Sequence, residues 1–199
     1  MRIDLVETTA LAVAARAGDA AAFDELVRTC DRVVLELAER LLLDHHEAED
    51  VRQWAWFKAW RALPGYDARA SFPTWLYRIV VNACRDRART LRRAPPTRPL
   101  PLSLVSKSSE RASGPAGALE HAELRERVVA AIESLPADER EAVVLRHYHE
   151  LNASEIADVV GRPRTTVQSC LARALSRLSI RLKAHAEPPL LRAPVARTP

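Results

Sequence analysis

Apolar residues recur along most of this chain at intervals of three and four residues, the spacing that places them on one face of an α-helix. The pattern is sustained from Phe23 to Leu41 and returns from Leu124 to Leu135. The period-two alternation of half-buried strands is scarce, and Ala, Leu, Arg and Glu dominate. The sequence therefore predicts an all-α protein.

Residues 92–118 interrupt this pattern with five prolines, many serines and no helical period. Such a stretch inside one compact domain would be unusual, so it predicts a flexible linker. We expect two small helical domains, at residues 1–91 and 119–184, and a disordered tail at residues 185–199.

Local signals divide the first half into three helices. Asp44 is placed to start a helix, and Leu63, Pro64 and Gly65 together predict its end. A short polar loop is expected over residues 66–71. Pro73 suits the first turn of the next helix.

Charge is segregated along the 199 residues, although the net charge is only +4. Residues 1–50 carry a net −7 and residues 58–98 a net +8, whereas residues 99–160 carry −5 and residues 161–199 carry +7. Two basic blocks, each preceded by an acidic one, predict two separate surfaces for polyanions.

Several classes of protein are not supported by the residues. The longest apolar runs are far shorter than the roughly 20 residues that span a bilayer, and the N-terminus lacks the features of a signal peptide. We therefore expect a soluble cytoplasmic protein without membrane insertion. No glycine-rich nucleotide motif is present, so no cofactor is expected.

Cysteines and histidines do not form a metal-binding pattern. We interpret the three widely separated cysteines as small apolar helix residues and the histidine pairs as surface groups; they are Cys30, Cys84, Cys170, His45, His46, His147 and His149. No metal site and no catalytic residue are expected.

The stretch from about Leu135 to Lys183 has the pattern of a helix-turn-helix. Ser154 is a candidate N-cap, Gly161 suits the tight corner, and Pro163 opens the second helix. Ala157 and Val167 stand at the spacing where two closely crossing helices need a small residue and an anchor. We expect the inward side of the second helix to hold Val167, Leu171, Ala174, Leu175 and Leu178.

The N-terminal part of that second helix offers a polar side for the major groove. Arginine and glutamine present paired hydrogen-bonding groups suited to guanine and adenine, and other arginines suit phosphates. Candidate base-reading residues are Arg164, Thr165, Thr166, Gln168 and Ser169, and candidate phosphate-binding residues are Arg162, Arg173 and Arg177.

Both halves together resemble the extracytoplasmic-function group of the sigma-70 family. The resemblance rests on ARAGDAAAFDELV, AEDVRQWAWFKAWRAL and SFPTWLYRIVVNACRD in the first half, and on LPADEREAVVLRHY and SEIADVVGRPRTTVQSCLARALSRL in the second. It implies a region 2 helical bundle and a region 4 helix-turn-helix. It also implies a non-enzymatic transcription initiation factor that binds core RNA polymerase and directs it to −10 and −35 promoter elements, aiding promoter melting. An anti-sigma factor is an implied further partner.

In this family the helix corresponding to residues 48–54 docks on the polymerase, which implies Glu49, Asp50, Gln53 and Trp54 as contacts. An acidic first turn favoured by the helix dipole explains Glu49 equally well. Many relatives have an acidic residue where this chain has Trp54, so the docking surface differs.

The resemblance also implies that the third helix and the preceding loop read the −10 element. The residues are Arg61, Tyr66, Arg69, Arg78, Asn82, Arg85 and Arg89. Tyr66 has two open roles, stacking on a captured base or packing in the protein. We expect Trp56, Phe57, Trp60 and Trp75 in the core. In the recognition helix, Gln168 and Cys170 replace basic residues common among relatives, so we expect weaker phosphate contacts and a different −35 preference.

Two other functions remain open on the sequence alone. One is a helix-turn-helix regulator that acts without polymerase. The other is a helical adaptor that sequesters a partner.

Overall fold

The computed structural model describes residues 4–93 and 115–184, and for residues 115–122 only the backbone. These ranges contain eight α-helices, one short 3₁₀ turn and no strand, which confirms the all-α prediction. The predicted linker lies largely, and the predicted tail wholly, outside the described residues.

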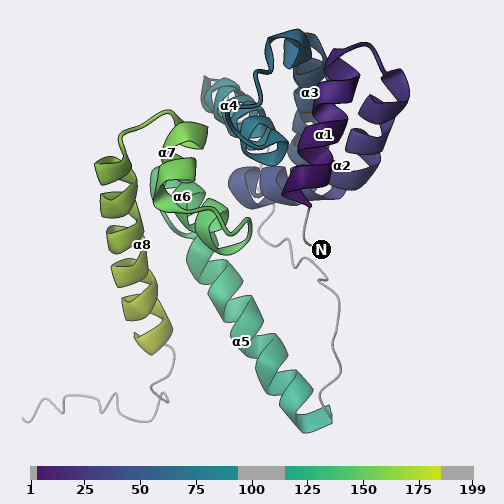
Figure 1. Cartoon of the computed structure of the whole chain (residues 1–199). Coiled ribbons are helices and arrows are strands. Elements are labelled where there is room, and N and C mark those ends of the chain that lie inside the picture. Colours follow the sequence, from purple (N-terminus) through teal and green to yellow (C-terminus); the bar gives the residue numbers. More distant parts are fainter. Residues whose placement is uncertain (1–3, 94–114, 185–199) are drawn as a thin grey trace, which may run out of the picture.

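The first half is a four-helix bundle made of α1 (Leu5–Arg16), α2 (Ala20–Leu42), α3 (His45–Ala62) and α4 (Phe72–Arg93) (Figure 1). The 3₁₀ turn η1 (Leu63–Gly65) follows α3 and ends it, as predicted. Asp44 caps α3 by accepting a hydrogen bond from the Glu47 amide.

Helix α1 was not predicted from the pattern. Its buried face consists of small residues, Thr8, Ala12 and Ala15, so the sequence shows no apolar stripe there. Small side chains allow the α1 backbone to approach α2 and α4 closely.

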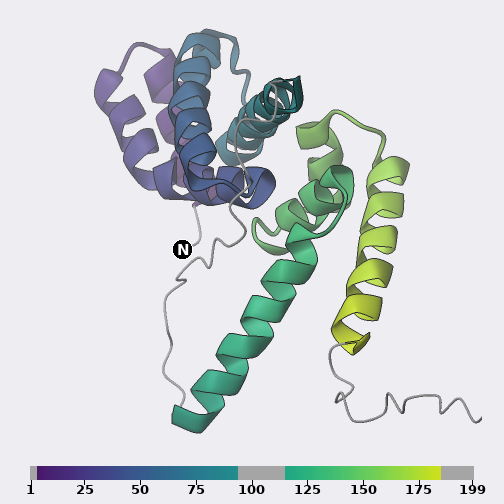
Figure 2. The same cartoon turned by 180° about the vertical axis from the view of Figure 1, so that it is seen from behind.

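The second half contains α5 (Pro115–Glu133), α6 (Ala137–His147), α7 (Ala153–Val160) and α8 (Arg164–Ala184). Helix α5 projects from the body, and α8 lies beside it (Figures 1 and 2). Gly161 ends α7 with a left-handed φ of 66°, and this corner turns the chain into α8.

Two local predictions in this half are wrong. The N-cap of α7 is Asn152, which forms a capping box with Glu155, and not Ser154. Leu175 is exposed, so the inward side of α8 is formed without it by Val167, Leu171, Ala174 and Leu178.

The three cysteines are buried thiols, as the sequence predicts. Burial raises the pKa of Cys30 and of Cys84 to about 12. No helix in the described ranges has both the length and the apolar composition to cross a membrane.

The core of the first half should tolerate little loss of volume at Leu26, which is fully buried. Leu26→Ala should lower the free energy of unfolding by about 2–5 kcal/mol. All four tryptophans of the chain lie in α3 and α4, so urea unfolding followed by tryptophan fluorescence reports on this bundle. The matched substitution Leu91→Ala, at an exposed position, should change the transition much less; an equal loss at both positions would contradict this assignment of the core.

Candidate nucleic-acid interface

The outer side of α8 carries the predicted base-reading residues. Arg164, Thr165, Gln168 and Ser169 are exposed near its N-terminus, whereas Thr166 is half-buried. Val167 and Cys170 face inward and fix the helix against α6 and α7. The N-terminal turns of α8 thus present a polar face of the kind that enters a major groove.

The three candidate phosphate-binding arginines are tied to acidic residues of α6. Arg173 Nε donates to Glu139 Oε1 at 3.3 Å, and Arg177 Nε lies 3.1 Å from Glu139 Oε2. Glu139 is only 4% exposed, whereas both arginines keep more than half of their side chains exposed. The buried carboxylate therefore orients two guanidinium groups that still face solvent.

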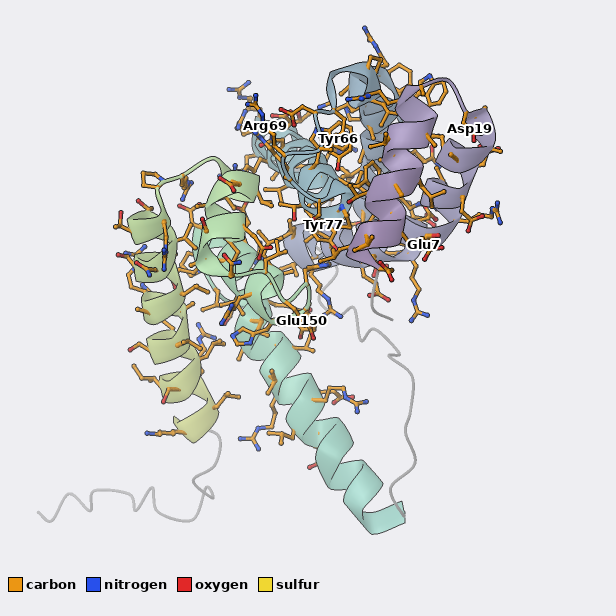
Figure 3. All side chains as sticks on the ribbon, in the orientation of Figure 1. Glu7, Asp19, Tyr66, Arg69, Tyr77 and Glu150 are labelled. Atoms are coloured by element: carbon orange, nitrogen blue, oxygen red, sulfur yellow. The ribbon has the colours of Figure 1, made fainter. Side chains whose placement is uncertain are left out.

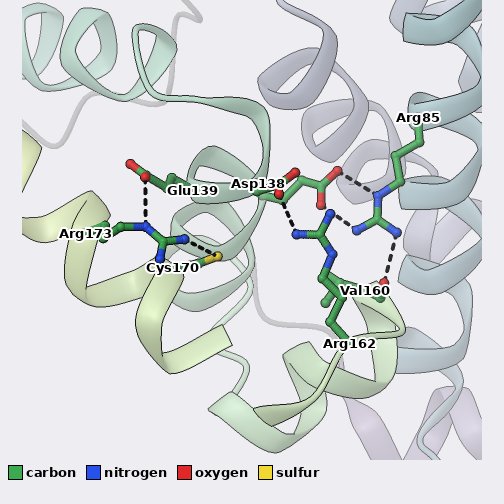
Figure 4. Close-up of polar contacts among 8 residues, drawn as sticks. Arg85, Asp138, Glu139, Val160, Arg162, Cys170 and Arg173 are labelled. Carbon is green, nitrogen blue, oxygen red and sulfur yellow. Dashed lines mark hydrogen bonds and ion pairs between the residues drawn. The ribbon is translucent and has the colours of Figure 1, made fainter. Parts of the chain in front are cut away.

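Arg162 forms a similar pair at the corner of the motif. Its Nη1 donates to Asp138 Oδ2 at 2.5 Å, and the guanidinium holds the pKa of Asp138 below its usual value. Figure 4 shows this pair and the Arg173–Glu139 pair, whose carboxylates come from consecutive residues in the first turn of α6.

The second candidate surface lies on α4 and the loop before it. Arg78, Asn82 and Arg89 are exposed along α4, and Arg61 and Arg69 are exposed at the end of α3 and in the loop. Figure 3 shows Arg69 at the edge of the bundle.

Tyr66 occupies the core and is 2% exposed. Its ring packs against Phe72 and Trp75, and its hydroxyl donates to the Ala70 carbonyl at 2.8 Å. The structure favours the packing role of Tyr66 over the stacking role.

Arg85 does not face outward with its neighbours on α4. It forms a bidentate pair with Glu141 of α6, with contacts of 3.0 and 2.7 Å, and donates to the Val160 carbonyl at 2.9 Å. These contacts join the two halves (Figure 4). Arg85, which the sequence predicts to bind DNA, is thus hydrogen-bonded to the second half of the chain in this arrangement.

Further contacts hold the halves together. Arg140 of α6 donates to the carbonyl of Leu41 at 3.1 Å, and Arg40 of α2 lies over the Tyr148 ring at 3.6 Å. Tyr77 of α4 packs against the His149 ring, with centroids 4.7 Å apart. The prediction that His149 is a surface residue is therefore wrong.

The predicted polymerase-binding residues lie on α3. Asp50, Gln53 and Trp54 are exposed, and Glu49 is half-buried, 3.6 Å from His45. Trp54 stacks on Phe57 with centroids 5.2 Å apart. We call Trp54 and Phe57 the aromatic patch.

Two of the four aromatic residues expected in the core are not there. Phe57 is 47% exposed and Trp60 is 51% exposed, although the Trp60 ring contacts Phe23. Trp56 is buried and its Nε1 donates to Asp31, while Trp75 packs against the core.

Family models match both halves of the chain. Sigma-70 region 2 matches residues 26–94, and Sigma-70, region 4 matches residues 125–178.

Among curated relatives, the chain is 34% identical to the RNA polymerase sigma-H factor of Pseudomonas aeruginosa over 79% of this chain and 84% of the relative. It is 35% identical to the ECF RNA polymerase sigma-E factor of Escherichia coli K12, with the same shares covered. A solved structure of CnrH in complex with the cytosolic domain of CnrY matches with a TM-score of 0.65 and 28% identity, over 89% of this chain and 98% of that one.

The contact around His149 should make the protein sensitive to mild acid. Burial, and secondarily the positive charge of Arg40, lower the pKa of His149 from 6.5 to about 4. Between these two values the unfolded chain binds a proton that the folded chain does not, so stability falls as the pH falls. At pH 5 the loss relative to pH 7 should be about 2 kcal/mol in urea unfolding followed by circular dichroism.

The substitution His149→Phe keeps a ring against Tyr77 and should remove most of this pH dependence. His147→Phe, at an exposed position, is the matched control and should keep it. An unchanged pH dependence in His149→Phe would contradict the burial of this imidazole.

Proposed function

The chain belongs to the extracytoplasmic-function group of the sigma-70 family, whose members direct core RNA polymerase to promoters. From this we propose which surface of the protein binds each promoter element and which binds the polymerase. Helix α8 reads the −35 element, α4 with the loop before it reads the −10 element, and α3 docks on the polymerase. The protein acts in the cytoplasm, by binding alone and without a catalytic group.

One observation carries this division: exposed basic residues form two separate surfaces on two helical domains, at α4 and at α8. A regulator that acts without polymerase would need only the second surface. The match of region 2 to the first half favours the sigma role over that alternative and over an adaptor that has lost DNA binding.

For the −35 element we assign base contacts to Arg164 and Gln168, with Thr165, Thr166 and Ser169 beside them. Arg162, Arg173 and Arg177 bind phosphates. Because Glu139 already orients Arg173 and Arg177, these side chains have less conformational entropy to lose when they bind phosphates.

For the −10 element we assign Arg61, Arg69, Arg78, Asn82 and Arg89 to the DNA strand, and Arg85 after the domains separate. Tyr66 is not assigned a stacking role, because its ring is buried. Melting draws on the binding of an unstacked base, which offsets an unpairing cost of a few kcal/mol.

Promoter binding requires that the two domains move apart. The −10 and −35 elements are centred about 25 base pairs apart, or roughly 85 Å of B-DNA at 3.4 Å per pair. In the arrangement described here, Arg85 on the −10 surface touches Glu141, next to the residues that support α8. The compact arrangement therefore cannot bind both promoter elements at once. When the two domains separate, Arg85 leaves Glu141 and can bind a phosphate.

We also propose an anti-sigma factor as a partner. Its support is that CnrH, at 28% identity, was solved in complex with the cytosolic domain of CnrY.

The experiment that tests the function is transcription in vitro from a promoter library with added core polymerase. The protein should yield promoter-specific transcripts only together with core. Protection of an operator by the protein alone, without any core-dependent transcript, would overturn the sigma role.

Replacing Arg164 or Gln168 with Ala should reduce discrimination between −35 sequences by about 1–3 kcal/mol for each base that the side chain reads. The measurement is holoenzyme binding to promoters that differ at single −35 positions. Lys183→Ala, at an exposed position late in the same helix, should weaken binding to all sequences alike. If neither Arg164→Ala nor Gln168→Ala changed the discrimination between −35 sequences, the base-reading residues would lie elsewhere.

The double substitution of Asp50→Asn and Gln53→Ala should lower affinity for core polymerase at least tenfold, or by roughly 1.4 kcal/mol. Both side chains are exposed on α3, so helicity should not change. Glu36→Gln on α2 is the control, because it removes an acidic charge away from α3. Retained core affinity in the double variant, measured by fluorescence anisotropy, would refute the docking assignment.

A further inference from the structure

Helix α1 holds both ends of the loop that precedes α4. Arg16, in its last turn, donates from Nη1 to the Tyr66 carbonyl at 2.7 Å. Thr9, in its first half, accepts a hydrogen bond at Oγ1 from the Phe72 amide at 3.2 Å. One helix thus contacts the residue that starts the loop and the residue that follows it.

The loop between these anchors is ordered by its own contacts. The Tyr66 hydroxyl donates to the Ala70 carbonyl, and the Asp67 carboxylate accepts from the Arg69 amide at 3.1 Å. Ala68 takes a left-handed φ of 58°, which turns the chain at the tip. Residues 67–69 are exposed, whereas Tyr66 and Phe72 are buried. The anchors therefore project a short, shaped tip into solvent.

The position of α1 makes these contacts possible. Thr8, Ala12 and Ala15 pack the neighbouring side of α1 into the bundle, which fixes the position of the helix that carries Thr9 and Arg16. The region 2 match begins at residue 26, after α1 has ended. The residues that hold the loop thus lie outside the matched segment.

We propose that Thr9 and Arg16 are positioning residues for −10 recognition, acting through the loop of residues 66–71. This inference rests on the proposed role of that loop in reading the −10 element. A loop held at both ends loses less conformational entropy on capturing a base and presents its tip in one geometry. Without the anchors the tip samples several geometries, and both capture and discrimination between bases weaken.

The test uses the full-length protein with core polymerase. Thr9→Val removes the acceptor of the Phe72 amide with little change in shape, and Arg16→Met removes the donor to the Tyr66 carbonyl. Thr9→Ser restores a hydroxyl and should rescue. Thr29→Val and Arg32→Met, both on α2, are matched controls whose hydrogen bonds stay within α2.

Two measurements are made on each holoenzyme. One is the binding of a single-stranded non-template oligonucleotide, with either the preferred base or a substituted base at each −10 position. The other is the rate of promoter opening, followed with a fluorescent base analogue in the −10 element. We expect Thr9→Val and Arg16→Met to slow opening about fivefold to tenfold and to reduce the preference for the correct base. Core affinity and −35 binding should stay as in the parent.

The base preference separates positioning from a purely structural role, because a bundle that is merely less stable loses active protein without changing which base it prefers. An unaltered base preference in both variants, or failure of Thr9→Ser to rescue, would overturn the inference. If Thr9→Val does not fold, Arg16→Met alone decides. Arg69→Ala at the loop tip distinguishes the two proposals. If it leaves −10 binding and opening unchanged, the loop does not read the −10 element. If it weakens them while Thr9→Val and Arg16→Met behave like the parent, only the positioning by α1 is refuted.

Discussion

The arrangement of the two halves depends on the pairing of one arginine with one nearly buried carboxylate. Glu141 is 7% exposed, and leaving its charge without a partner at that depth would be strongly destabilising. Arg85 satisfies it with two hydrogen bonds and uses a third on the Val160 carbonyl. Arg85 is also among the residues proposed to bind the −10 element, so the contact that stabilises the compact arrangement occupies a side chain that this proposal needs.

Within the second half, the acidic residues of α6 have a related effect on the basic residues of the helix-turn-helix. Asp138 and Glu139 pair with Arg162, Arg173 and Arg177 beside the proposed base-reading residues of α8. A free arginine side chain loses much rotamer entropy when it binds, and these side chains have lost part of it already. Two residues of the acidic block at residues 99–160 thus orient three arginines of the basic block that follows it.

The sequence predicted those parts of the fold whose signals are local and repetitive. A long apolar stripe identified α2, Pro73 marked the first turn of α4, and Gly161 marked the corner of the helix-turn-helix. Helix α1 was missed because its buried face is small, and the anchors Thr9 and Arg16 were missed with it. The Arg85–Glu141 pair joins residues 56 positions apart and leaves no local pattern. Exposure of Phe57 depends on which face of α3 meets its neighbours, which periodicity alone left open. Burial of Tyr66 depends on how the loop packs against Phe72 and Trp75, which no local pattern in the sequence indicates.

The aromatic patch has a consequence for the protein in solution. Trp54 and Phe57 stack on each other, yet about half of each side chain remains in contact with water. Such a surface is attracted to other apolar surfaces, including those of further copies, and the attraction grows with concentration and with salts that favour apolar burial. A partner that covered Trp54 and Phe57 would remove this apolar surface from water and weaken the attraction between copies.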